Sequence, residues 1–226
     1  MSDSRTGEPT LRLDHVSFVD GDREVLQGVS FEVHPGERVG LEFAQAHGGK
    51  TILLEIAAGL REPSGGSVWF GGQPLRTGDQ REGAPRMAFV FRHDGGLFPN
   101  QTLLDNVSLP LRYHDVPEEE ADRRALEALR EVELEDAAER FPWELTREAM
   151  RLAALARALV YDPELVLVDD FFPGPDEGSF VVAARVIERA RAQGTAFLLV
   201  VEPGQRGVDR VVRIDRGAVV RASTSG

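Results

Sequence analysis

The chain has 226 residues, and its 38 acidic and 26 basic side chains give a formal net charge of −12. This excess of acid argues against general nucleic-acid binding, which usually requires a basic surface. The chain contains no cysteine, so disulfides and thiolate metal sites are excluded. Its length suits one large α/β domain or two small lobes. No apolar run is as long as a membrane span, and Met1–Thr10 lacks the apolar core of a signal peptide.

Hydrophobic periodicity predicts an α/β chain with a helical stretch from about Pro99 to Leu159. Alternation or short apolar runs indicate strands, and apolar residues on one face indicate helices. The expected strands are Leu11–Phe18, Val25–Val33, Arg38–Phe43, Ser67–Phe70, Met87–Phe91, Leu165–Val168, Ala196–Val201, and a C-terminal hairpin of Val208–Ile214 with Ala218–Arg221. The expected helices are Thr51–Leu60, Glu118–Glu133, Glu148–Val160 and Phe180–Ala192.

The segment Ala44–Thr51 fits the phosphate-loop pattern G-x-x-x-x-G-K-[ST] at every fixed position except the first. It follows a predicted strand and begins a predicted helix, which is the context that the motif requires. Loop and helix N–H groups would bind phosphate oxygens, the lysine would reach the outer phosphates, and the threonine would ligate Mg²⁺. Ala44 in place of glycine strains the entry turn, and His47 adds bulk. The predicted nucleotide-binding residues are Ala44, His47, Gly48, Gly49, Lys50, Thr51 and Ile52.

Other short motifs lie before and after the phosphate-loop segment in a fixed order and spacing: Leu13–Phe18, Leu53–Leu60, Leu97–Val107, Leu155–Leu159, Asp162–Asp169 and Asp215–Gly217. With these motifs the chain resembles the ATP-binding cassette of an ABC transporter, from Leu11 to Val220. The stretch Leu109–His114 resembles cassettes that serve bacterial lipid trafficking.

The resemblance implies an α/β fold of the P-loop NTPase type. Its RecA-like mixed sheet would carry an N-terminal antiparallel β subdomain and an inserted α-helical subdomain. Residues 1–226 would form one ATP-binding domain. Its core lobe would comprise 10–91 and 160–222, and the insert 92–159.

The resemblance also implies partners and cofactors. Two cassettes of this family meet head to tail, and each ATP is capped by the Leu-Ser-Gly-Gly-Gln signature of the other cassette. The implied cofactors are ATP and Mg²⁺, and the implied partners are a second cassette, identical or different, and a transmembrane permease. The chain would be cytoplasmic, held peripherally at the inner face of the cell membrane by that permease. Leu97, Phe98 and Leu103 would contribute to permease docking.

Several residues depart from the family's catalytic pattern. Asp169 ends an apolar strand at the position of the family's Mg²⁺-binding aspartate. Asp170 stands where the family has its catalytic glutamate, and its shorter side chain falls about one ångström short, a misplacement that costs on the order of a hundredfold in rate. Pro203 replaces the switch histidine and can neither donate a side-chain hydrogen bond nor hold a water. Asp170 is therefore an impaired base.

Three further departures concern the position that would stack on adenine, the position of a glutamine near the metal, and the signature segment. Asp20 replaces the stacking aromatic and offers no ring. Arg92 replaces a glutamine and cannot ligate a cation. Thr146, Arg147 and Glu148 replace the Ser-Gly-Gly of the signature. This segment suits a capped helix better than a phosphate cap, because Thr146 is a good N-cap and Glu148 a good first-turn residue.

These departures leave three hypotheses open. The chain is a degenerate cassette that binds nucleotide, clamps a permease and hydrolyses ATP slowly or not at all. Alternatively, it is a working ATPase that tolerates the substitutions, since phosphoryl transfer depends mostly on positioning and charge neutralisation. A third hypothesis is a scaffold or regulatory subunit that binds no nucleotide.

Overall fold

The computed structural model describes residues 7–45, 48–78, 86–92, 95–169, 177–205 and 207–224. The chain divides into two compact units, one formed by Met1–Pro85 with Ala196–Gly226 and the other by Arg86–Thr195. Within the described ranges, no helix is long and apolar enough to cross a membrane.

The first unit contains an antiparallel sheet in the order β2-β1-β4-β5. Its strands are β1 (Leu11–Asp20), β2 (Arg23–Val33), β4 (Gly65–Phe70) and β5 (Gln73–Pro74). Strand β1 joins β2 through a tight turn in which Gly21 has a φ of 59°, a conformation that glycine adopts without steric cost.

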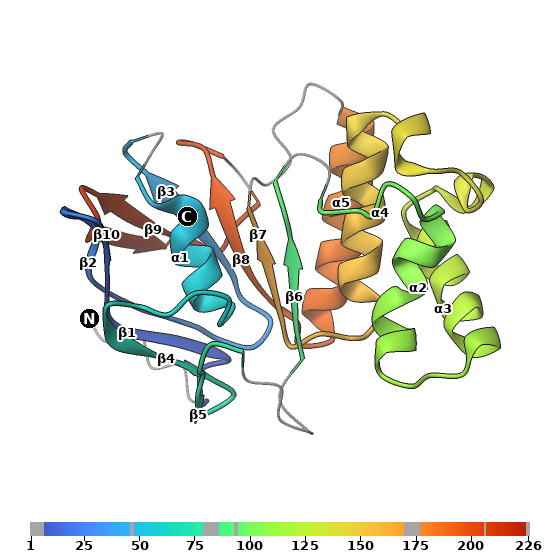
Figure 1. The fold of residues 1–226 in the computed structure, drawn as a ribbon. Coiled ribbons are helices and arrows are strands. Elements are labelled where there is room, and N and C mark those ends of the chain that lie inside the picture. The colour runs from blue at the N-terminus through green and yellow to red at the C-terminus, as the bar shows by residue number, and fades with distance from the viewer. Residues whose placement is uncertain are drawn as a thin grey trace. The chain divides into compact units, whose positions relative to one another are not determined.

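A second set of strands in the same unit runs in the order β10-β9-β3-β8 (Figure 1). These strands are β3 (Arg38–Phe43), β8 (Ala196–Val201), β9 (Arg210–Asp215) and β10 (Ala218–Thr224). Strand β3 is parallel to both β8 and β9, and every residue of β8 is buried. Helix α1 (Lys50–Ala57) follows β3 after a short loop. The loops that leave β3 and β8 therefore begin at the same edge of the sheet.

The second unit combines a parallel strand pair with four α-helices. The pair is β6 (Met87–Val90) and β7 (Leu165–Val168). Helix α4 contacts α2, α3, α5 and β6, and Figure 1 shows these helices gathered around it. The helices are α2 (Leu103–Tyr113), α3 (Glu118–Glu131), α4 (Arg147–Leu159) and α5 (Glu177–Ala192), with 3₁₀ turns at Glu135–Ala137 and Pro142–Glu144.

The apolar residues whose spacing predicted an amphipathic helix in the insert are buried in the structure. Ala121, Ala125, Leu129 and Val132 are fully buried, as predicted for one face of an amphipathic helix. The opposite face of α3 is charged: Arg123 donates to Glu120 and Glu127 at 2.6 Å, and the bond to Glu120 holds the pKa of that carboxyl below its ordinary value.

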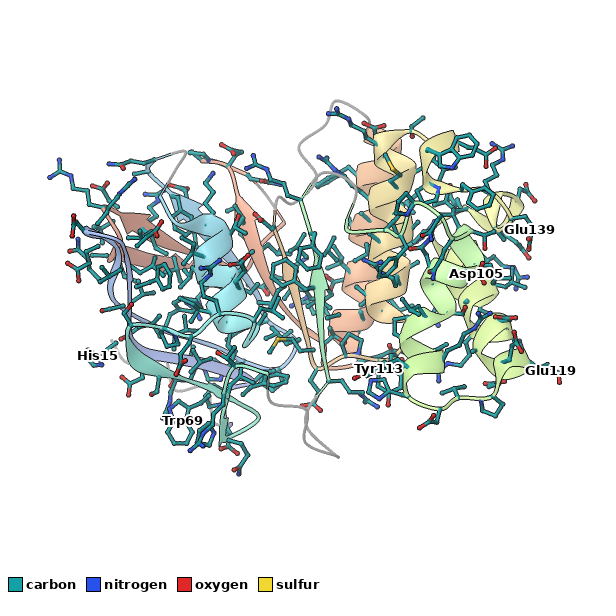
Figure 2. All side chains as sticks on the ribbon, viewed as in Figure 1. His15, Trp69, Asp105, Tyr113, Glu119 and Glu139 are labelled. Carbon is teal, nitrogen blue, oxygen red and sulfur yellow. The ribbon has the colours of Figure 1, made fainter. Side chains whose placement is uncertain are left out.

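The predicted strands and helices are all present, and their ends differ from the prediction by a few residues. Within the helical stretch predicted from about Pro99 to Leu159, the structure has a separate helix, α2, whose bounds the sequence analysis did not predict. Asp105 lies in its first turn and Tyr113 at its end, both labelled in Figure 2. Thr102 caps this helix by accepting from the backbone N–H of Asp105 at 3.1 Å.

A buried carboxylate joins distant parts of the first unit. Glu37, only 4% exposed, accepts from Arg210 Nε at 2.7 Å and from the backbone N–H of His34 at 2.9 Å. The next residue, Arg38, donates to Asp209 Oδ1 at 3.0 Å. These contacts bring the start of β3 to the start of β9 across more than 170 residues of sequence.

We expect Glu37→Ala to lower the free energy of unfolding by about 3 kcal/mol, because it leaves the Arg210 charge largely buried without its partner. Chemical denaturation would measure this loss. Glu24→Ala, on the exposed face of β2, is the control, and we expect a change within about 0.5 kcal/mol. A similar small effect for both variants would contradict a stabilising role for Glu37.

Candidate phosphate-binding site

The phosphate-loop motif lies at the start of α1 in the first unit. Gly49 is the N-cap residue with a φ of 87°, and it has no side chain that could cap the helix. The described first turn of α1 contains no acidic residue, and Lys50 is its first residue. The N-terminus of a helix carries partial positive charge and N–H groups that lack helical acceptors. This end of α1 therefore suits a polyanion.

Glycine is required at position 49 for two structural reasons. Its φ is in the left-handed region, and a Cβ there would lie 2.8 Å from Cγ1 of Val25. The β9–β10 turn also approaches β2 closely, because a Cβ on Gly217 would lie 2.4 Å from the Val25 carbonyl oxygen. Strand β2 therefore packs between the β9–β10 turn and the start of α1.

The other predicted loop residues surround this point. Ala44 is exposed, and its N–H donates to the Ile214 carbonyl at 3.0 Å. Gly48 donates to the Gln45 carbonyl at 3.1 Å. Thr51 is exposed and Ile52 half-buried in the first turn of α1. His47 lies outside the described residues, so the crowding predicted for it stays a prediction.

A carboxylate that the sequence did not single out lies next to the lysine. Lys50 Nζ is 3.8 Å from Glu202 Oε1. Glu202 follows the last residue of β8, and Val201 pairs with Glu42 on β3. Pro203, also exposed, is the next residue and forms part of the turn from Glu202 to Gln205, as predicted for a turn former.

Asp20 lies at the end of β1, exposed and paired in register with Arg23. It belongs to the β1–β2 turn that was predicted at this position. The neighbouring Val19 is 45% exposed. A carboxylate and an aliphatic side chain provide no ring for an adenine to stack on.

In the second unit, Asp169 and Arg92 follow the ends of the paired strands β7 and β6. Asp169 is 4% exposed, and its N–H donates to the Val90 carbonyl at 3.0 Å. Arg92 is exposed. Asp170, the predicted impaired base, lies outside the described residues.

The segment that replaces the signature forms the start of α4. Thr146 is its N-cap and accepts from the backbone N–H of Ala149 at 3.2 Å. Arg147 is exposed, and Glu148 is half-buried in the first turn. The predicted helix cap is confirmed. Because this end of the helix already has a hydroxyl cap and an acidic side chain, it is poorly suited to a further anion.

The predicted docking residues differ sharply in exposure. Leu97 is 5% exposed and Leu103 fully buried, so both belong to the core and neither offers a direct surface contact, while their predicted effect on permease association stays a prediction. Their substitution would disturb the fold. Phe98 is 47% exposed and can contact a partner. Asn106, fully buried, holds the backbone of Phe98 on both sides: it accepts from its N–H at 2.7 Å and donates to its carbonyl at 3.1 Å.

Arg157 of α4 is a positioning residue that sequence reasoning did not find. Its guanidinium donates to the carbonyls of Gly96 at 2.8 Å and Gly95 at 2.7 Å. A Cβ on Gly95 would lie 2.1 Å from Cβ of Ala154, so only glycine permits this approach. The signal in the sequence is a single arginine among the small apolar residues of 153–158.

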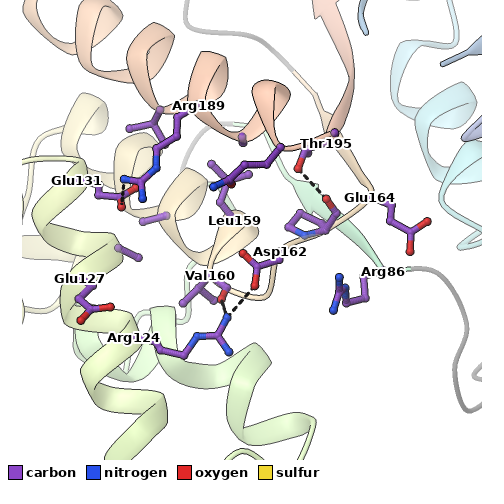
Figure 3. A pocket seen from close by; sticks show the side chains of 17 residues that line it. Arg86, Arg124, Glu127, Glu131, Leu159, Val160, Asp162, Glu164, Arg189 and Thr195 are labelled. Carbon is purple, nitrogen blue, oxygen red and sulfur yellow. Dashed lines mark hydrogen bonds and ion pairs between the residues drawn. The ribbon is translucent and has the colours of Figure 1, made fainter. Parts of the chain in front are cut away.

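A separate pocket of about 490 Å³ lies within the second unit (Figure 3). None of the predicted site residues that the structure describes lines it. Arg124 donates to the Val160 carbonyl at 2.7 Å and to Asp162 at 3.0 Å, and Arg189 pairs with Glu131. An anion would have to displace these internal contacts, so the pocket is not a good phosphate site.

A phosphate-loop motif that begins α1 and an aspartate at the end of an apolar strand are features of P-loop nucleotide-binding proteins. The family model described as ABC transporter matches residues 26–172, and the chain belongs to this family as its ATP-binding component.

Curated relatives and solved structures agree with this assignment. The lipoprotein-releasing system ATP-binding protein LolD of Pseudomonas fluorescens is 36% identical over 87% of this chain and 88% of its own length. The cell division ATP-binding protein FtsE of Escherichia coli is 32% identical over 84% and 86%. A dimeric post-hydrolysis structure of the cassette MJ0796 bound to ADP and Pi has a TM-score of 0.82 at 25% identity, over 95% of this chain and 98% of that one. The predicted fold class is confirmed.

The cap on α4 can be tested by stability. We expect Thr146→Ala to lower the free energy of unfolding by about 1 kcal/mol, because the N–H of Ala149 loses its acceptor. Thr77→Ala, at an exposed threonine outside any helix, serves as the matched control and should have little effect. Denaturation curves that coincide for the wild type and Thr146→Ala would show that the cap contributes nothing.

Proposed function

We propose that the chain is a degenerate ABC cassette that binds nucleotide at the start of α1, clamps a membrane permease, and hydrolyses ATP weakly or not at all. The observation that carries this proposal is the contrast between two helix starts. The start of α1 has Gly49 and Lys50 and, among the described residues, no side-chain cap, whereas the start of α4 is occupied by its own Thr146 and Glu148. The chain thus has features for holding phosphate and lacks features for capping it across a dimer.

The residues near the start of α1 include some that favour nucleotide binding and some that oppose it. Gly48, Gly49, Lys50, Thr51 and Ile52 would contact the phosphates through backbone N–H groups and the lysine. The Glu202 carboxylate beside Lys50 opposes a polyanion. The exposed Asp20 gives adenine no stacking partner. We infer binding through the phosphates, with a weak contribution from the base.

Thr51 would ligate Mg²⁺ together with phosphate oxygens and water, and Asp169 stands at the position of the family's Mg²⁺-binding aspartate. Within the described ranges, no group of three or more histidine, aspartate and glutamate side chains could hold a metal by itself. Mg²⁺ commonly binds through one or two protein ligands plus substrate phosphates, so such a cluster is not needed. When bound, the ion would neutralise phosphate charge, while Asp170 would be too short to activate water well.

The partners follow from family membership and from one exposed aromatic. We infer a transmembrane permease and a second cassette, which place the chain peripherally at the inner face of the cell membrane. Phe98 is the predicted docking residue that remains exposed. The likeness to a lipoprotein-releasing system protein supports a role in lipid or lipoprotein trafficking.

A working ATPase is the second candidate. It is favoured by retention of Lys50, Thr51 and Asp169, and by likeness to relatives described as ATP-binding proteins. A scaffold that binds no nucleotide is the third hypothesis. The three differ in two measurable quantities, nucleotide affinity and the rate of phosphate release.

Nucleotide binding is tested by calorimetric titration of the purified chain with ADP and ATP in the presence of Mg²⁺. We expect saturable binding that Lys50→Ala weakens at least tenfold, because the lysine supplies the positive charge nearest the outer phosphates. Arg76→Ala, at an exposed cation whose segment contacts the chain beyond the C-terminal end of α1, should bind as the wild type does. Absence of binding by the wild type would favour the scaffold.

Hydrolysis is tested by steady-state phosphate release. We expect turnover below about 0.1 per second, a hundredfold under the typical enzyme value of about 10 per second, because Asp170 and Pro203 replace the base and the switch histidine. Faster release that Lys50→Ala abolishes would establish the working ATPase and refute the degenerate cassette.

A further inference from the structure

The lysine of the phosphate loop already has a negative partner in the same unit. Lys50 Nζ lies 3.8 Å from Glu202 Oε1, with the lysine side chain 16% exposed and the glutamate 65% exposed. The lysine side chain is therefore largely buried, and the carboxylate beside it is largely in solvent. A phosphate that binds Lys50 would come close to this carboxylate.

The backbone fixes the position of Glu202. Strand β8 is in register with β3 up to the pair Glu42 and Val201, and Glu202 is the next residue. Two hydrogen bonds between Glu202 and Gln205 close the turn that follows. Gln205 donates its N–H to the Glu202 carbonyl at 3.1 Å, and its side-chain Oε1 accepts from the Glu202 N–H at 3.0 Å.

The two central residues strengthen this turn. Pro203 restricts its own φ, and Gly204 has a φ of 79°, the combination that a type II turn requires. The carboxylate is thus presented beside Lys50 by a defined turn on a buried strand.

We propose that Glu202 determines nucleotide specificity by lowering the preference of this site for a nucleoside triphosphate over a diphosphate. This inference rests on the proposed function, namely that the start of α1 binds nucleotide. A third phosphate brings further negative charge to the lysine and must displace the carboxylate or lie beside it. A diphosphate can be held mainly by the loop and helix N–H groups, at a greater distance from Glu202.

The expected effect of Glu202 on the preference between triphosphate and diphosphate is moderate, because its side chain is largely exposed. Water and salt screen its charge, and the side chain can turn away from the lysine when a phosphate enters. We expect Glu202 to change the ratio of the ATP and ADP dissociation constants by about tenfold, which corresponds to about 1.4 kcal/mol.

The test is a set of calorimetric titrations with MgADP and MgATP on the full chain. In Glu202→Gln, we expect ATP to bind about tenfold more tightly relative to ADP than in the wild type, while ADP affinity changes less than about twofold. Glu202→Asp withdraws the carboxylate by one methylene and should give an intermediate ratio. Glu62→Gln, at an exposed glutamate beyond the end of α1, removes the same charge elsewhere and should leave the ratio unchanged.

The outcomes separate this inference from the proposed function. Binding of both nucleotides with the same ratio in wild type and Glu202→Gln would overturn the inference and leave nucleotide binding intact. An unchanged ratio together with slower phosphate release would also overturn it, and would indicate that the carboxylate acts as a base. ATP binding that appears only in Glu202→Gln would support the inference. Absence of binding by every form would overturn both.

Discussion

The parallel pairing of β3 with β8 and β9 is the constraint on which the first unit depends. Parallel strands place their carboxyl ends at one edge, so the loop before α1 and the turn after β8 must leave the sheet together. Lys50 and Glu202 meet for this reason, although about 150 residues separate them in the sequence. The buried Glu37 fixes the opposite end of β3 through Arg210. One strand, anchored at both ends, thereby positions the residues that would contact phosphate.

The chain has the architecture of its family, and we propose that several residues of the catalytic pattern implied by the resemblance are replaced. Core strands, the loop glycines and the helical insert remain, and similarity to a solved cassette extends over 95% of the chain. Three of the residues that depart from the implied pattern have clear structural roles: Pro203 forms a turn, Thr146 caps a helix, and Asp20 ends a hairpin strand. Each of these residues agrees with the local fold around it.

Sequence reasoning predicted the elements well because each depends on local pattern. The apolar runs of β7 and β8 and the buried face of α3 carry their own periodicity, and the Thr146 cap needs only three residues of context. Contacts between distant segments could not be predicted in this way. Nothing near Glu202 in the sequence indicates Lys50, and the burial of Leu97 depends on tertiary packing that its local sequence does not reveal.

The contacts of Arg157 have a mechanical consequence. The arginine binds the carbonyls of Gly95 and Gly96, and Ala154 packs directly on Gly95. Phe98 lies two residues further along and is held by Asn106. The segment that carries this exposed ring is therefore bound both to α2, through Asn106, and to α4, through Arg157. A partner that contacts the ring would rest on a segment attached to two helices.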